Sequence, residues 1–150
     1  LDDLTDDDLE ESLDINLRGT LVCTRAAVPL MMTRGSGRVL CAASMSTRIG
    51  AVGLTAYAAS KAAVVGMTRT WARELGPKGI TANAVAPGLI DSETTSTVPA
   101  GELEATLARL PARRVGQPDE VAAVYLFLAS DLASFINGAV VGVDGGLALV

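Results

Sequence analysis

The sequence predicts a fold of the α/β class, in which a parallel β-sheet is covered by helices on both faces. Long segments with the spacing of an amphipathic helix alternate with short apolar segments three times along the 150 residues. The short segments are apolar at nearly every position, which is typical of strands buried on both faces. Because three strands are few for such a sheet, we expect these residues to be the second half of a larger domain.

The first helix is expected over residues 6–33. Thr5 precedes three aspartates at positions 6–8, so it can cap a helix whose acidic first turn suits the helix dipole. Apolar residues then recur at helical spacing: Leu9, Leu13, Leu17, Leu21 and Val28. The glycine-rich turn 35–37 ends this helix, and the apolar run 38–43 is expected to be a buried strand.

A second long helix is expected over residues 56–75, after a loop over residues 44–55. A Gly-Pro pair at positions 76–77 ends it, as such pairs commonly end helices. The next apolar run, residues 80–86, is expected to be the second strand. It stops at the Pro-Gly pair 87–88.

The periodicity is weaker after the second strand. Residues 89–112 have mixed polarity, with a short helix expected near 101–109. Pro118 suits the first turn of a third helix that runs to about residue 130. The last strand is expected over residues 139–143, closed by the turn 144–146.

The composition excludes several kinds of site. The chain has no histidine and two cysteines, Cys23 and Cys41, whose spacing is not that of a CxxC motif. Ser-His-Asp and Cys-His nucleophiles and Cys/His zinc sites are therefore excluded within these residues, and no metal site is expected. Both cysteines lie in apolar runs, so we expect them to be reduced core residues of a cytoplasmic protein.

The net charge of −5 comes from one end of the chain, because eight acidic residues and no basic residue fall within the first 14 positions. No basic stripe with interleaved aromatic residues is present, so nucleic acid is not an expected partner. No apolar run approaches the ~18–20 residues of a membrane span, and no signal peptide is recognisable. A membrane is not an expected partner either.

Polar or glycine-rich residues follow each predicted strand. Ligands of open α/β sheets bind beyond the carboxyl ends of the strands. This rule selects Ser44 with Ser46, Pro87 with Gly88, and the turn 144–146. Strands also end in such residues for purely structural reasons, so none of the three places identifies a site by itself.

Tyr57 and Lys61 lie one turn apart on one face of the second predicted helix. A tyrosine can pack on a lysine stem without any chemical role. However, this pair opens its helix soon after Ser44, close to the expected ligand edge. A phenol titrates near pH ~10 and is a poor acid–base catalyst at neutrality. A neighbouring ammonium and a second positive charge, such as an oxidised nicotinamide ring, would favour the phenolate.

Ser44, thirteen residues before Tyr57-Ala58-Ala59-Ser60-Lys61, resembles the Ser…Tyr-x-x-x-Lys pattern of the short-chain dehydrogenases/reductases. Four further stretches resemble this family in the same order: 14–19 (its helix with an active-site asparagine), 79–88 (its sixth strand and nicotinamide-side turn), and 114–121 and 138–146 (the C-terminal signature of its shorter members). The resemblance is closest to the 3-oxoacyl-carrier-protein-reductase-like branch.

The resemblance implies a Rossmann-like, doubly wound parallel sheet, with residues 1–150 as the C-terminal half of one domain. It also implies an NAD- or NADP-dependent oxidoreductase that interconverts a ketone and a secondary alcohol. Tyr57 would be the general acid–base, and Lys61 would hold the cofactor ribose and favour the phenolate. Ser44 would bind the substrate oxygen. Asn16 would anchor a water that links Lys61 to solvent.

The position of Asn16 on its helix predicts a buried amide independently of the resemblance. It shares a helix face with Leu13 and Thr20, so its amide would be buried there and need hydrogen-bond partners. The alternative is a solvated surface asparagine.

On the cofactor side, Pro87, Gly88 and the backbone of Ile90 would contact the nicotinamide carboxamide. Ser92 stands where the family usually has threonine and keeps the hydroxyl group. Ser46 is expected to be a loop residue. Arg114 follows a second arginine, which invites a phosphate site, but capping or pairing with the helix at 118 is expected instead.

The family's glycine-rich phosphate loop has no counterpart here, because the glycines at 35–37 precede a strand instead of linking a strand to a helix. We expect about 100 residues to precede this chain and to select NAD or NADP. The helices at 6–33 and 56–75 would form the interface of a homodimer or homotetramer. Two alternatives stay open: a truncated remnant that acts as an interaction module, and a lyase or epimerase of the extended branch, which the ending at 138–146 disfavours.

Overall fold

Three parallel strands form the sheet in the computed structural model, which describes residues 1–149. The strands β1 (Gly37–Ala42), β2 (Ile80–Pro87) and β3 (Val140–Val143) lie side by side in that order, so β2 is central. Both strand pairs are parallel. The three carboxyl ends therefore meet at one edge of the sheet, as predicted.

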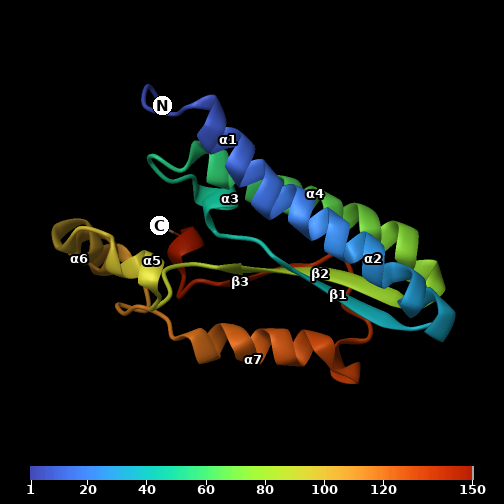
Figure 1. The fold of residues 1–150 in the computed structure, drawn as a ribbon. Coiled ribbons are helices and arrows are strands. Elements are labelled where there is room, and N and C mark those ends of the chain that lie inside the picture. Colours follow the sequence, from blue (N-terminus) through green and yellow to red (C-terminus); the bar gives the residue numbers. More distant parts are fainter. Residues whose placement is uncertain (150) are drawn as a thin grey trace.

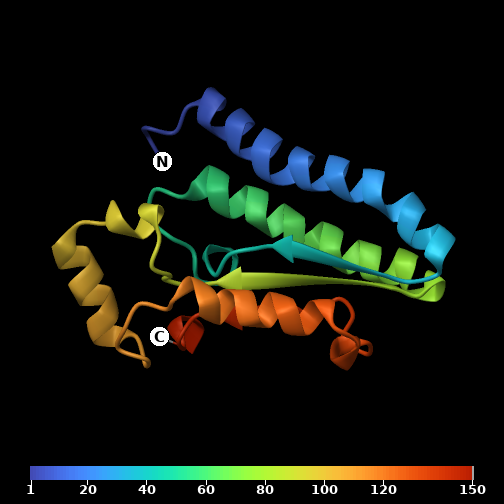
Figure 2. The same cartoon turned by 60° about the horizontal axis from the view of Figure 1, so that its bottom comes forward.

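Helices cover both faces of this sheet (Figures 1 and 2). On one face lies α4 (Thr55–Leu75), with the N-terminal helical segments beside it, and on the other face lies α7 (Pro118–Ala129). The predicted α/β class is confirmed. Pro118 occupies the first turn of α7, and a capping box formed by Gln117 and Glu120 starts that helix.

The N-terminal helix runs without a break from Asp6 to Arg34, close to the predicted 6–33. It consists of α1 (Asp6–Ser12), a π-helical segment η1 (Leu13–Arg18) and α2 (Gly19–Arg34). The predicted cap at Thr5 is confirmed, since Thr5 and Asp8 form a capping box. The π segment was not expected. Its wider turns change the direction of the side chains that follow it. Leu21 continues the predicted apolar spacing of the helix but is 40% exposed for this reason.

Two short helices interrupt segments expected to be irregular. Within the loop 44–55, α3 (Ser46–Ile49) forms one turn, and α5 (Glu93–Ser96) follows the end of β2. The predicted helix near 101–109 is present as α6 (Ala100–Arg109). Single 3₁₀ turns complete the chain: η2 (Gly76–Lys78), η3 (Asp131–Ala133) and η4 (Leu147–Leu149).

The core lies on both sides of β2. Alternate β2 residues from Ile80 to Ala86 pack with Cys41 and Val64 between the sheet and α4, while Val85 packs with Leu128 on the α7 side. Cys41 is buried, as predicted.

The prediction for Cys23 was wrong, because Cys23 is exposed. It belongs to the apolar run 21–23, whose three residues are all exposed, because only one side of α2 faces the rest of the molecule.

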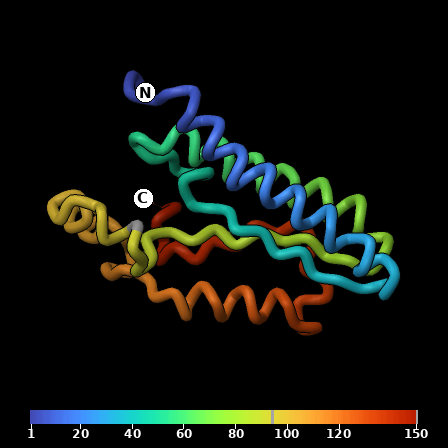
Figure 3. The backbone as a smooth tube through the Cα atoms, in the orientation of Figure 1, coloured from blue at the N-terminus to red at the C-terminus, as the bar shows by residue number. Residues whose placement is uncertain are grey.

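Figure 3 shows that both ends of the described chain lie at the carboxyl edge of the sheet, together with the segment that carries α5 and α6. Across residues 1–149, no helix combines the length and the hydropathy needed to cross a membrane.

Candidate active site

A hollow of about 240 Å³ opens at the carboxyl edge of the sheet. The residues that line it come from the ends of β1 and β2, the start of α4, and α5 with the connection before it: Ala43, Ser44, Tyr57, Pro87, Gly88, Ile90, Ser92 and Thr95. Six of the eight residues proposed from the sequence are among them. The other two do not line it: Lys61 lies one turn after Tyr57 on α4, and Asn16 bonds Ser60 on the same helix.

Ser44 is held at the end of β1 by backbone bonds on both sides of it. The amide of Ala43 donates to Val85 O (2.8 Å) and the amide of Met45 donates to Pro87 O (3.0 Å), which continues the β1–β2 pairing past the strand. The hydroxyl oxygen of Ser44 accepts hydrogen bonds from the amide (3.2 Å) and the hydroxyl (3.0 Å) of Ser46. The Ser44 proton can therefore be donated to a ligand.

Ser46 was expected to be a loop residue without a role, but it contacts the Ser44 hydroxyl directly. Its two hydrogen bonds orient the Ser44 hydroxyl, and Ser46 itself begins α3. The sequence signal was a second serine at i+2 after a strand end, a spacing at which local hydrogen bonds of this kind form.

Tyr57 and Lys61 occupy the first two turns of α4. The Lys61 ammonium lies 5.6 Å from the centroid of the Tyr57 ring, a cation–π geometry, and donates a hydrogen bond to Ala42 O at 3.1 Å. Burial lowers the pKa of Lys61 below its ordinary value. The cation is thus held between the end of β1 and the phenol.

Asn16 lies in the π-helical segment, and its amide is half-buried. Its Nδ2 donates to Ser60 Oγ at 3.1 Å, and Ser60 Oγ donates to Tyr57 O at 2.8 Å. The amide therefore has the partner that was expected, although it is half-buried and not fully buried.

Ser60 was not singled out from the sequence, although it is completely buried. It shares the inner stripe of α4 with Ala56 and Val64, four residues before and after it. The sequence signal for Ser60 is a hydroxyl group on an otherwise apolar helix stripe, because a buried hydroxyl needs a hydrogen-bond partner.

The end of β2 presents the residues proposed for the cofactor. The amide of Gly88 donates to Val143 O (3.0 Å), and a Cβ atom at Gly88 would lie 2.8 Å from Asp144 Cα. Only glycine allows β2 and β3 to end so close together. Ile90 O accepts a hydrogen bond from the Thr95 hydroxyl, which also lies 3.3 Å from Ser92 Oγ. Thr95 was not predicted, because no local pattern places it against Ile90.

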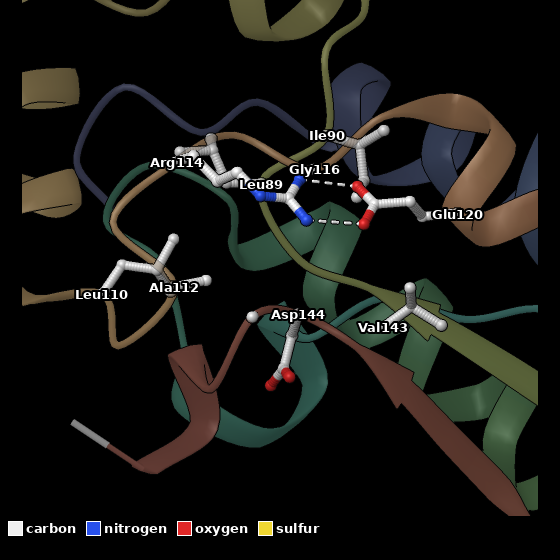
Figure 4. Close-up of a pocket in the computed structure, with 10 residues that line it drawn as sticks. Leu89, Ile90, Leu110, Ala112, Arg114, Gly116, Glu120, Val143 and Asp144 are labelled. Atoms are coloured by element: carbon white, nitrogen blue, oxygen red, sulfur yellow. Dashed lines mark hydrogen bonds and ion pairs between the residues drawn. The ribbon is translucent and has the colours of Figure 1, made fainter.

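Arg114 forms the predicted pair with the following helix. Its guanidinium binds both oxygens of Glu120, at 2.7 and 2.6 Å (Figure 4). This guanidinium and the Gln117 amide lower the pKa of Glu120 to about 2.

Comparison with known proteins identifies the family. Residues 1–148 match the family model described as Enoyl-(Acyl carrier protein) reductase. The chain belongs to the short-chain dehydrogenase/reductase family. The 3-oxoacyl-acyl-carrier-protein reductase FabG of Thermotoga maritima is a relative with 43% identity over 146 residues, which cover 97% of this chain and 59% of the relative.

Other short-chain dehydrogenases/reductases give the same result. The (3R)-3-hydroxyacyl-CoA dehydrogenase of Homo sapiens is 40% identical over 96% of this chain and 56% of its own length. The crystal structure of a gluconate 5-dehydrogenase from Burkholderia cenocepacia, in complex with NADP and tartrate, superposes with a TM-score of 0.95 at 32% identity. It is matched over 99% of this chain and 59% of that chain. The chain thus spans less than two thirds of the length of these relatives.

The hollow is smaller than a pocket that encloses a whole ligand. Pockets that enclose whole drug-sized ligands measure about 300–1,000 Å³. The volume of this hollow, about 240 Å³, lies below that range. Within the described residues, no group of three or more His, Cys, Asp or Glu side chains is arranged to hold a metal ion.

Proposed function

We propose that the protein is an NAD- or NADP-dependent oxidoreductase that interconverts a ketone and a secondary alcohol. The observation that carries this proposal is the convergence of Ser44 and Tyr57 on one hollow, with the Lys61 ammonium 5.6 Å from the phenol ring. The nicotinamide ring, when bound, supplies or accepts the hydride. The named activities of the relatives, which include FabG and a gluconate 5-dehydrogenase, support the same reaction class.

Each residue has one task in this proposal. In the reduction, Tyr57 Oη gives its proton to the substrate oxygen, and in the oxidation it takes that proton back. The Ser44 hydroxyl donates a hydrogen bond to the same oxygen and stabilises the charge that develops there. The Lys61 ammonium stabilises the phenolate and holds the ribose hydroxyls. Asn16, fixed by Ser60, anchors a water that returns the proton from solvent.

The carboxamide of the cofactor would be held at the end of β2 by Pro87, Gly88, Ile90 and Ser92. Because Ile90 O already accepts a bond from Thr95, the Ile90 amide is the group left to face the carboxamide.

The substrate is a small carbonyl or alcohol compound. The two free cysteines support a cytoplasmic location.

We also propose that the protein is a homodimer or homotetramer. On α2 the outer stripe of Val22, Ala26, Pro29 and Leu30 is exposed, although it is apolar. The exposed side of α4 carries the small residues Ala59, Ala62 and Gly66, which permit close helix packing, and beyond them the charged residues Arg69, Arg73 and Glu74. A second copy that covers both helices would bury these apolar surfaces.

The substitution Tyr57→Phe tests the catalytic role. It removes only the phenol oxygen, so we expect turnover to fall by about 10²–10⁴-fold while the Kd of the cofactor changes little. The measurement is steady-state kinetics with cofactor titration on the natural gene product. Tyr125→Phe is the matched control, because Tyr125 is the other of the two tyrosines, lies on α7 and does not line the hollow; its hydroxyl donates to Cys41 O at 3.4 Å. Near-normal turnover of Tyr57→Phe would overturn the proposal.

A further inference from the structure

The segment that carries Ile90 is tied to a distant turn. Gly116 pairs with Ile90 in a single parallel β-bridge. The amide of Gly116 donates to Leu89 O at 2.9 Å, and the amide of Asp91 donates to Gly116 O at 2.8 Å. The two backbone polar groups of Gly116 therefore hold the residues immediately before and after Ile90.

The turn around Gly116 is itself closed by Arg114 and Glu120. Besides its two bonds to Glu120, Arg114 Nη1 donates to Val115 O at 3.2 Å. Glu120 Oε2 also accepts from the Gln117 amide at 2.7 Å. The ion pair thus fixes the neighbours of Gly116 on both sides.

Contact between the turn and Ile90 is close. A Cβ atom at Gly116 would lie 2.7 Å from Ile90 Cδ1. The cavity between Ile90, Arg114, Glu120 and the end of β3 holds only about 60 Å³ (Figure 4). A displacement of the turn would be transmitted to Ile90, because closely packed groups leave little room to absorb it.

We propose that Arg114 and Glu120 are positioning residues that set the Ile90 backbone for the nicotinamide carboxamide, acting through Gly116. The proposal rests on the proposed function, in which Ile90 faces that group. Neither side chain is among the residues that line the hollow, so the effect passes through the turn. Their ion pair is largely exposed, and exposed pairs contribute little to global stability. The consequence of losing it is therefore local.

The test compares two ligands on the natural gene product. One is the complete cofactor, NADP or NAD, and the other is the matching fragment without the nicotinamide ring, 2′-phospho-ADP-ribose or ADP-ribose. In Glu120→Gln we expect the Kd of the complete cofactor to rise about fivefold or more, while the Kd of the fragment stays unchanged. A merely structural role would weaken both ligands together. Arg114→Lys, which keeps the charge but loses the two-point contact, serves as the second variant.

Hydrogen exchange without any ligand separates this proposal from the proposed function. Exchange of the Asp91 and Gly116 amides should accelerate in Glu120→Gln, whether or not the protein binds a nicotinamide cofactor. Asp131→Asn is the control, because Asp131 is fully exposed, pairs with Arg38 away from the turn around Gly116, and should alter neither readout. Equal weakening of both ligands, or unchanged cofactor affinity in both variants, would overturn the proposal. Failure of the Tyr57→Phe test alone would instead overturn the proposed reaction.

Discussion

Lys61 shows at the scale of one residue how stability and chemistry oppose each other. Its pKa is lowered by burial, so the folded chain binds this proton more weakly than the unfolded chain does. The charge therefore costs stability at neutral pH, and that cost disappears as the pH rises from the folded to the unfolded pKa. The bond to Ala42 O and the contact with the Tyr57 ring keep the ammonium in place despite this cost.

We expect Lys61→Met to separate the two effects. The substitution keeps the aliphatic stem and removes the charge, so turnover should fall by about 100-fold or more and cofactor affinity should decrease. The melting temperature should stay the same or rise, because the cost of burying the charge is removed. Calorimetry and cofactor titration measure both effects. Lys78→Met is the control, since Lys78 is the other lysine and is exposed. Full activity with a lower melting temperature would contradict this account.

At the scale of elements, the site depends on the crossing of the π-helical segment η1 with α4. Asn16 and Ser60 are 44 residues apart and meet where these helices touch. The wider turns of the π segment set the direction in which the Asn16 side chain projects from the helix. Because Ser60 also bonds Tyr57 O, the crossing connects the N-terminal helix to the turn that carries the phenol.

Ser60→Ala tests this crossing through stability. It leaves the half-buried Asn16 amide without its acceptor, so we expect the free energy of unfolding to fall by about 1–3 kcal/mol. Urea denaturation followed by circular dichroism measures the change. Thr70→Ala is the matched control on α4: its hydroxyl bonds Gly66 O but is exposed, so the change should stay within about 0.5 kcal/mol. Equal effects of the two substitutions would show that the Asn16–Ser60 bond contributes nothing.

At the scale of the whole molecule, the apolar stripe of α2 favours self-association. Leu30, the last residue of that stripe, is 70% exposed. Similar apolar exposure occurs on the opposite side, after α7, where Leu132 is 84% exposed. Burial of the α2 stripe by a second copy is the arrangement proposed above.

The substitution Leu30→Glu should therefore reduce the mass of the assembly, because a charge buried in an apolar interface is strongly unfavourable. Light scattering coupled to size-exclusion chromatography measures that mass. Leu132→Glu places the same charge on the opposite side and tests whether any exposed acid has this effect. An unchanged mass for Leu30→Glu would contradict an interface on α2.

The order of helices and strands was predictable because its signals are local. The spacing of apolar residues indicates whether a segment is a helix or a strand, and residues typical of helix starts, such as Thr5 and Pro118, indicate where a helix begins. The rule that ligands bind beyond strand ends, together with the Tyr57–Lys61 spacing, predicts four of the residues that line the hollow: Ser44, Tyr57, Pro87 and Gly88. Ile90 and Ser92 follow only from the family resemblance.

Only the tertiary structure decided the contacts between distant segments. The bond from Asn16 to Ser60, the closure of Gly116 on Ile90 and the exposure of Cys23 all depend on which element covers which face. A local pattern shows that a face is apolar or that a polar group needs a partner. It does not show which segment packs against that face or supplies that partner, because the packing of the whole chain decides this.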